Sequence, residues 1–169
     1  MDMKILVDSY WNLEARVQQS QPDAIISIMD NATLAPKLGF DPPRHLSLGF
    51  HDIEEPTEDR TPPSSDHLTR MINFAIHQRA AGARSILVHC MAGVRRSPAA
   101  AYIIAVAVRH EDPLRAAHVL FQKAPFVDPN RLMIKCADDL LGMNHAMSDS
   151  IAISKPLEQD HLQQHFFWI

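Results

Sequence analysis

Cysteine is scarce in this chain of 169 residues, and long hydrophobic runs and excess positive charge are missing, and each of these features excludes a class of protein. Its two cysteines, Cys90 and Cys136, cannot build the disulfide framework of a small secreted domain. No apolar stretch approaches the roughly 20 residues that cross a bilayer. The formal net charge of -4 argues against nucleic acid or an anionic membrane as the main partner. We therefore expect a cytoplasmic protein without a membrane span, whose thiols stay reduced.

The sequence is rich enough in apolar residues, at 46%, to form one ordinary domain with a hydrophobic core. Short apolar stretches predict strands, and longer stretches with apolar residues three and four apart predict helices. The expected strands are 4–7, 24–28, 45–50 and 85–89, and the expected helices are 10–19, 65–81, 97–109, 112–123 and 128–141. This order favours a single α/β domain, with a central, mostly parallel sheet of about four to five strands flanked by helices.

Three polar residues, each followed by proline, mark expected helix starts. Ser97, Asp112 and Asp128 are each suited to cap a helix N-terminus, and the following proline suits the first helical turn. The helix after Ser97 is apolar on nearly all sides, so we expect it at the centre of the fold.

The last residues depart from this pattern. We expect the domain to comprise residues 1–147, and residues 148–169, polar until they end in HFFWI, to form a C-terminal appendage. Three exposed aromatics together would be unusual, so we predict that they pack on the domain or on a second copy of the chain. His161 and His165 are four residues apart but have no carboxylate pair nearby, so we expect no metal site.

The stretch HCMAGVRRS, residues 89–97, connects the last expected strand to the apolar helix. In such a turn the backbone N–H groups and the helix dipole favour an anion. Cys90 opens the turn, Gly93 permits a close backbone approach, and Arg96 ends it with a planar fork that can bind two oxygens. The positive surroundings favour the thiolate form of Cys90, which is a nucleophile. A lone buried cysteine is more often a small hydrophobic residue, and we interpret Cys136 in that way.

HCMAGVRRS resembles the His-Cys-five-residues-Arg-Ser signature of the protein tyrosine phosphatase superfamily, and is most similar to its small dual-specificity branch. APFVDPNRLM resembles the Pro-Asn lead-in to a late helix in that branch, and FHDIEEP resembles a compact bacterial group of the superfamily. The resemblance covers roughly residues 24–142. It implies a metal-independent phosphomonoester hydrolase that needs no cofactor.

The resemblance also implies roles for individual residues. Cys90 attacks phosphorus to form a phosphocysteine intermediate, Ser97 donates a hydrogen bond that helps the sulfur to leave, and His89 orients the loop from behind. The phosphate is bound by Arg96 and by the backbone N–H groups of six residues, Met91, Ala92, Gly93, Val94, Arg95 and Arg96.

Arg95 departs from the pattern, because that position is more often serine or glycine in the relatives. Its side chain either extends the positive field toward polyanionic substrates or forms a salt bridge with an acid at the rim.

The leaving oxygen needs a proton, and the acidic loop 51–63 offers candidates for the general acid. Asp59 precedes Cys90 by 31 residues (90 − 59), close to the usual separation in short relatives, and Asp52 precedes it by 38 (90 − 52). Asp52 follows directly on a strand, which fixes its position, whereas Asp59 lies among prolines that we expect to bulge into water. We predict Asp52 as the general acid, with Asp59 as the alternative.

The expected substrate is a phosphorylated protein, phosphotyrosine first and with dual specificity open, or a small phosphomonoester. Met91, Ala92 and Val94 are apolar, whereas phosphoinositide-directed relatives often have lysines in this loop. The alternatives are a phosphatase of phosphoinositides or nucleotides, a rhodanese-like sulfurtransferase and a non-catalytic phospho-binding module. Ser97-Pro98 after the arginine disfavours the sulfurtransferase, and the presence of both Cys90 and Arg96 disfavours the module.

Overall fold

The structure is a computed structural model that describes residues 3–39, 44–156 and 167–168. Its centre is a sheet of order β3-β2-β4-β1-β5. Four strands are mutually parallel, and the short β5 pairs antiparallel with β1 at one edge. The strands are β1 (Lys4–Ser9), β2 (Ala24–Met29), β3 (His45–Gly49), β4 (Ser85–Cys90) and β5 (Phe167–Trp168). The single-domain α/β fold predicted from the sequence is confirmed.

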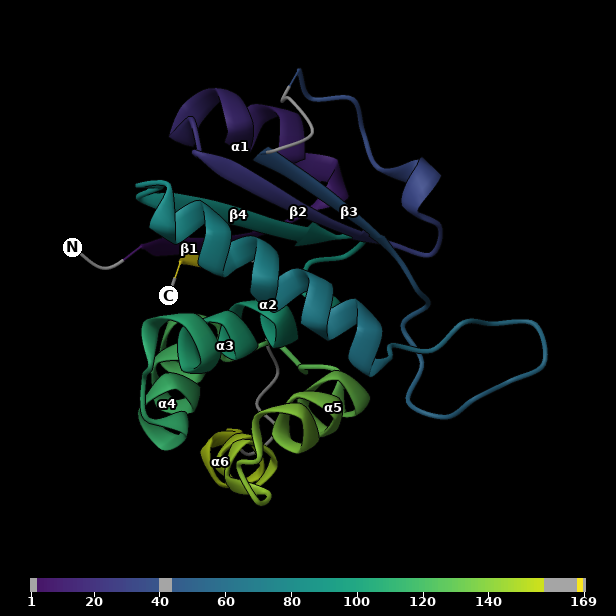
Figure 1. The fold of residues 1–169 in the computed structure, drawn as a ribbon, viewed down its shortest axis with the longest axis vertical. Helices are drawn as coiled ribbons and strands as arrows, with labels where there is room; N and C mark the ends of the chain where they lie inside the picture. Colours follow the sequence, from purple (N-terminus) through teal and green to yellow (C-terminus); the bar gives the residue numbers. More distant parts are fainter. Residues whose placement is uncertain (1–2, 40–43, 157–166, 169) are drawn as a thin grey trace.

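The sheet lies between two layers of helices (Figure 1). Helix α1 (Leu13–Ser20) covers one face, over a small apolar core that includes Leu6, Ile25 and Leu87. The other face carries the larger core and the remaining helices, which are α2 (Ser65–Ala80), α3 (Arg96–Arg109), α4 (Pro113–Lys123), α5 (Arg131–Leu141) and α6 (Ala146–Ser154). Because both faces are covered, β2 reads as a nearly continuous apolar run, AIISIM, buried at every position. Within the described residues, no helix is both long and apolar enough to cross a membrane.

Helix α3 runs through the centre of this larger core, as its composition predicts, but its N-cap differs from the prediction. The cap is Arg95, and Ser97 already lies inside the helix. The Ser97 hydroxyl does not cap the backbone because it contacts the Cys90 sulfur instead, at 3.2 Å. The predicted Ser97 cap was therefore wrong.

Helix α4 begins as predicted, with the Asp112 side chain accepting a hydrogen bond from the Arg115 N–H. Helix α5 begins two residues later than expected, because its cap is Asn130 and not Asp128. The Asn130 side chain accepts from the Met133 N–H at 3.0 Å, which leaves the Asp128 carboxylate free to face the loop before α3.

Helix α6 was not predicted, and it spans the boundary expected between residues 147 and 148. Met147 and Ile151 are buried, and the helix packs against α4 and α5. The Asp138 carboxylate of α5 accepts hydrogen bonds from the N–H groups of Met147 and Ser148, so it satisfies donors at the start of α6. The helix is short and contains three serines, so its hydrophobic periodicity is too weak to predict a helix.

Beyond α6, the described part of the tail is β5, whose backbone pairs Val7 with Phe167 and Leu6 with Trp168. Residues 157–166 and 169, which include His161, His165 and the other two residues of the HFFWI ending, lie outside the described residues. The packing of the aromatic side chains and self-association through the tail stay predictions.

Candidate active site

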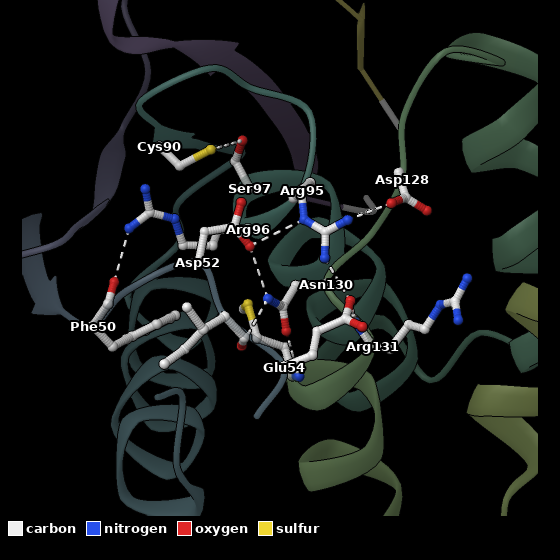
Figure 2. A network of polar contacts seen from close by, with 12 residues as sticks. Phe50, Asp52, Glu54, Cys90, Arg95, Arg96, Ser97, Asp128, Asn130 and Arg131 are labelled. Atoms are coloured by element: carbon white, nitrogen blue, oxygen red, sulfur yellow. Dashed lines mark hydrogen bonds and ion pairs between the residues drawn. The ribbon is translucent and has the colours of Figure 1, made fainter. Parts of the chain in front are cut away.

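The carboxyl ends of β1 and β4 lie next to each other, with Ser9 paired to Cys90, and the chain turns there into α3. We call residues 90–96 the Cys90 loop. The Cys90 side chain is buried, and its sulfur accepts a hydrogen bond from the Gly93 N–H at 3.3 Å. The Ser97 hydroxyl lies 3.2 Å from the same sulfur (Figure 2). Two polar groups and a helix N-terminus therefore surround the Cys90 sulfur.

Gly93 is required by the geometry of this loop. Its φ of +74° belongs to the left-handed region that glycine adopts at least cost. A Cβ atom at this position would lie 3.0 Å from the Ser9 nitrogen and 3.1 Å from the Asp8 carbonyl carbon. The Tyr10 N–H also donates to the Met91 carbonyl at 3.1 Å, so the loop packs closely on the end of β1.

Arg96, which ends the loop, is only 4% exposed. Its Nη1 donates to the Phe50 carbonyl and to Asp30 Oδ1, both at 2.8 Å. Its Nε is buried and has no hydrogen-bond partner among the described residues. An unsatisfied buried N–H group is costly, and an oxyanion bound in the loop would satisfy it through a strong charge-assisted bond.

His89 lies behind the loop, fully buried in β4. Its Nε2 is 2.6 Å from the Ser27 hydroxyl, which in turn is 2.8 Å from His45 Nε2. Burial lowers the pKa of His89 from 6.5 to about 4, so the ring is neutral near pH 7. A neutral ring bonded into the sheet is suited to orienting the loop. Ser27 and His45 were not identified from the sequence. The one sequence signal for Ser27 was that it is a polar residue inside an apolar strand.

The Arg95 side chain points toward the acidic side chains of Asp52, Glu54 and Asp128 (Figure 2). Its Nε donates to Asp52 Oδ1 at 3.2 Å, its Nη2 to Glu54 Oε1 at 2.5 Å, and its Nη1 to Asp128. Burial alone would lower the pKa of Arg95, but the carboxylates of Asp52, Asp128 and Glu54 raise it. Two roles were considered for Arg95, an extension of the positive field and a salt bridge with an acid at the rim. The structure shows the salt bridge. We call Arg95 and its three carboxylates the Arg95 cluster.

The two candidate general acids differ in their surroundings. Asp52 follows β3 and lies in the Arg95 cluster, where its Oδ1 also accepts from Asn130 Nδ2 at 2.8 Å. Asp59 is exposed in a tight turn where Thr57 faces Arg60, and the loop that carries this turn projects from the body of the molecule (Figure 1). Asn130 was not singled out from the sequence, although the Pro-Asn dipeptide that contains it was noticed. Asp30, 66 residues from its partner Arg96, gave no sequence signal.

Two aromatic residues, Tyr10 and Trp11, directly follow β1. Tyr10 packs edge-on against Trp11, with ring centroids 5.6 Å apart, and its ring centroid is 6.5 Å from that of His89. Trp11 is 77% exposed, and both aromatics line a cavity of about 450 Å³ between α1 and residues 36–38. Met91, itself exposed, follows Cys90 in the loop, and its carbonyl accepts from the Tyr10 N–H.

No protein-family model matches the sequence, and no curated protein sequence matches it. Solved structures do match the fold. The crystal structure of Cydia pomonella PTP-2 phosphatase aligns with a TM-score of 0.65 at 19% identity, over 80% of this chain and 84% of that one. DUSP15 aligns with a TM-score of 0.63 at 18% identity, over 89% and 87% of the two chains. PTPMT1 in complex with PI(5)P aligns with a TM-score of 0.59 at 15% identity, over 83% and 94%.

These likenesses show that the chain has the fold of the tyrosine and dual-specificity phosphatases.

Proposed function

We propose that this protein is a phosphatase that hydrolyses phosphomonoesters through a phosphocysteine intermediate on Cys90. One observation carries the proposal: the Cys90 sulfur lies at the start of an anion-binding loop whose last residue, Arg96, has a buried Nε without a partner in the described structure. A dianionic phosphoryl group fits both features. It would satisfy the guanidinium and the loop N–H groups while presenting phosphorus to the sulfur.

In the first step, the Cys90 thiolate attacks phosphorus and the bond between phosphorus and the leaving oxygen breaks. Arg96 and the backbone N–H groups of the loop bind the oxygens of the transferring group, whose charge they stabilise in the transition state. The leaving oxygen takes a proton from Asp52, whose position at the end of β3 brings it into the Arg95 cluster next to the loop.

In the second step, water attacks the phosphocysteine, and Asp52, now a carboxylate, accepts the proton of that water. The bond between sulfur and phosphorus breaks, inorganic phosphate forms, and the thiolate is restored. The Ser97 hydroxyl, 3.2 Å from the sulfur, stabilises the departing thiolate by a hydrogen bond. His89 stays neutral in both steps and supports the loop from the sheet.

A phosphotyrosyl protein is the substrate class that the surroundings favour. Met91 and Ala92 are exposed and apolar, and Tyr10, whose N–H donates to the Met91 carbonyl, has an aromatic ring suited to an aromatic ester. A second candidate is a phosphoinositide, because the likeness extends to PTPMT1, which was solved with PI(5)P. The apolar residues inside the loop favour the first candidate.

The test is phosphate release in the presence of EDTA, first from an aryl phosphate and then from a panel of phosphotyrosine and phosphoserine peptides, nucleotides and phosphoinositides. We expect hydrolysis without added metal and the highest kcat/KM on phosphotyrosine peptides. A matched Cys90→Ser preparation controls for contaminating phosphatases. Activity that depends on a divalent ion would contradict the mechanism, and sulfur transfer from thiosulfate to cyanide without phosphate release would indicate a sulfurtransferase.

A further inference from the structure

All three nitrogens of the Arg95 guanidinium donate to protein groups. Each of its three nitrogens donates to a different carboxylate, Nε to Asp52, Nη2 to Glu54 and Nη1 to Asp128. These carboxylates come from two segments that are far apart in the sequence, one after β3 and one before α5. Three acidic side chains surround one guanidinium, so Arg95 does not extend a positive field toward a substrate.

The two segments are attached to the Cys90 loop in different ways. The segment before α5 is bonded through its backbone, because the Asp128 N–H donates to the Val94 carbonyl at 3.0 Å and the Asn130 N–H to the Arg95 carbonyl at 3.2 Å. Residues 52–54 reach the Cys90 loop through the side chain of Arg95, and they reach the α5 segment through Asn130 and the Arg131 N–H. The position of Asp52 relative to Cys90 therefore depends on side chains.

We propose that Arg95 is a positioning residue that fixes the Asp52 carboxylate beside the Cys90 loop in the orientation needed for proton transfer. Arg95 Nε and Asn130 Nδ2 both donate to Oδ1 of Asp52, which assigns the transferred proton to Oδ2. Arg95 acts on the reaction through Asp52 and does not bind the phosphoryl group. The inference rests on the proposed phosphatase activity and adds to it a role for Arg95.

The cluster also reaches α6. Lys155, at the C-terminal end of that helix, donates to Asp128 Oδ1 at 2.6 Å, while Arg95 donates to Oδ2 of the same carboxylate. Lysine and arginine together lower the pKa of Asp128, which therefore stays ionised near neutral pH. Asp128 thus fixes the outer side of the Arg95 guanidinium.

The experiment compares Arg95→Gln with wild type on two substrates: a phosphotyrosine peptide, whose leaving oxygen needs a proton, and nitrophenyl phosphate, whose leaving group departs with little assistance. We expect kcat on the peptide to fall roughly 10- to 100-fold, because a misplaced acid loses much of its effect, and kcat on nitrophenyl phosphate to change far less. Vanadate affinity should stay within about twofold of wild type, because the loop amides and Arg96 are intact. In the double variant with Asp52→Asn, the Arg95→Gln loss should largely disappear.

Glu54→Gln is the second variant, because it removes one partner of Arg95 and leaves the arginine in place. It should reduce kcat on the peptide in the same selective way but less. Arg115→Gln, at an exposed arginine on α4, is the charge-matched control and should leave both substrates unaffected. Thermal unfolding of each variant shows that it is folded.

Two results would overturn the inference. Equal losses on both substrates together with weaker vanadate binding would mean that Arg95 binds the phosphoryl group. A loss that adds fully to that of Asp52→Asn would mean that Arg95 acts independently of the acid. Failure of the proposed function looks different, because wild-type protein would then release no phosphate from either substrate.

Discussion

On the β1 side the Cys90 loop packs backbone against backbone, whereas on the side of the 51–63 loop it is joined by charged side chains. The first contact brings Gly93 so close to Asp8 and Ser9 that a Cβ atom would lie at 3.0 Å, and it adds a hydrogen bond between the backbones of Tyr10 and Met91. The second contact is the Arg95 cluster, whose members are each about one third exposed.

This difference between backbone packing and ion pairing indicates that the two contacts have different functions within one small site. Backbone packing defines the shape of the anion-binding loop and admits almost no variation, because interiors are close-packed. Partly exposed ion pairs are individually weak, commonly about 0–1 kcal/mol, but several of them together can orient a loop. We therefore expect substitutions on the β1 side to damage folding and anion binding, and those on the acidic side to damage proton transfer.

The largest effects should come from substitutions in the Cys90 loop itself, which both contacts hold in place. Cys90→Ser should abolish turnover and retain vanadate binding, because the loop amides and Arg96 remain. Arg96→Lys should lower kcat/KM at least ~10²-fold and weaken vanadate binding as well, because a point charge cannot replace the planar fork. Steady-state kinetics and vanadate titration measure both variants. Substantial turnover by Cys90→Ser would exclude the covalent route.

The next variant is Gly93→Ala, which disrupts the packing of the Cys90 loop on β1. The added Cβ meets backbone atoms and the positive φ becomes strained, so we expect a loss of about 2 kcal/mol in the free energy of unfolding and a severe loss of vanadate affinity. Gly142→Ala is the matched control, because its φ is +63° but no atom lies within 4 Å of its Cβ position. It should cost about 1 kcal/mol and leave activity intact. Equal effects of the two variants in urea unfolding would show that close packing at Gly93 is unimportant.

Asp52→Asn removes a carboxyl group from the Arg95 cluster and should leave the packing of the Cys90 loop on β1 intact. We expect kcat on phosphotyrosine to fall ~10²–10⁴-fold, with a much smaller loss on nitrophenyl phosphate and an unchanged affinity for vanadate. Asp59→Asn, in the exposed turn of the same loop, should behave like wild type on both substrates. If Asp59→Asn shows the selective loss and Asp52→Asn does not, the assignment of the general acid is reversed.

The last prediction separates the sheet from the ion pairs by pH. The pKa of His89 is about 4 in the folded chain and near 6.5 in the unfolded chain, so below pH 6.5 the unfolded chain binds a proton that the folded chain excludes. Stability from the neutral ring is present above pH 6.5 and falls as the pH drops toward 4, by up to about 3 kcal/mol. Urea unfolding from pH 7 to pH 5 should therefore be steeper in pH for wild type than for His89→Asn. Identical slopes would contradict the low pKa.

The sequence predicted the four parallel strands because each is a short apolar run, and it predicted the Cys90 loop because its residue types meet within nine positions. The predictions from the sequence were wrong where a residue that is suited to cap a helix contacts a group distant in the sequence instead. Ser97 looked like a cap but contacts the Cys90 sulfur, and Asp128 looked like a cap but pairs with Arg95. Asp30 and Asn130 lie 66 and 78 residues from the groups they contact, and such pairings appear only once the chain is folded.

The central claim is that phosphorus becomes bonded to the Cys90 sulfur during turnover. The most direct measurement is an acid quench within milliseconds of mixing the protein with an aryl phosphate, followed by intact mass and peptide mapping. A Ser97→Ala variant is used beside wild type, because weaker assistance to the departing thiolate should let the intermediate accumulate. We predict one added phosphoryl group on the peptide that contains Cys90, more of it in Ser97→Ala and none in Cys90→Ser. Turnover by Ser97→Ala with no phosphorylated Cys90 peptide at any quench time would contradict the account.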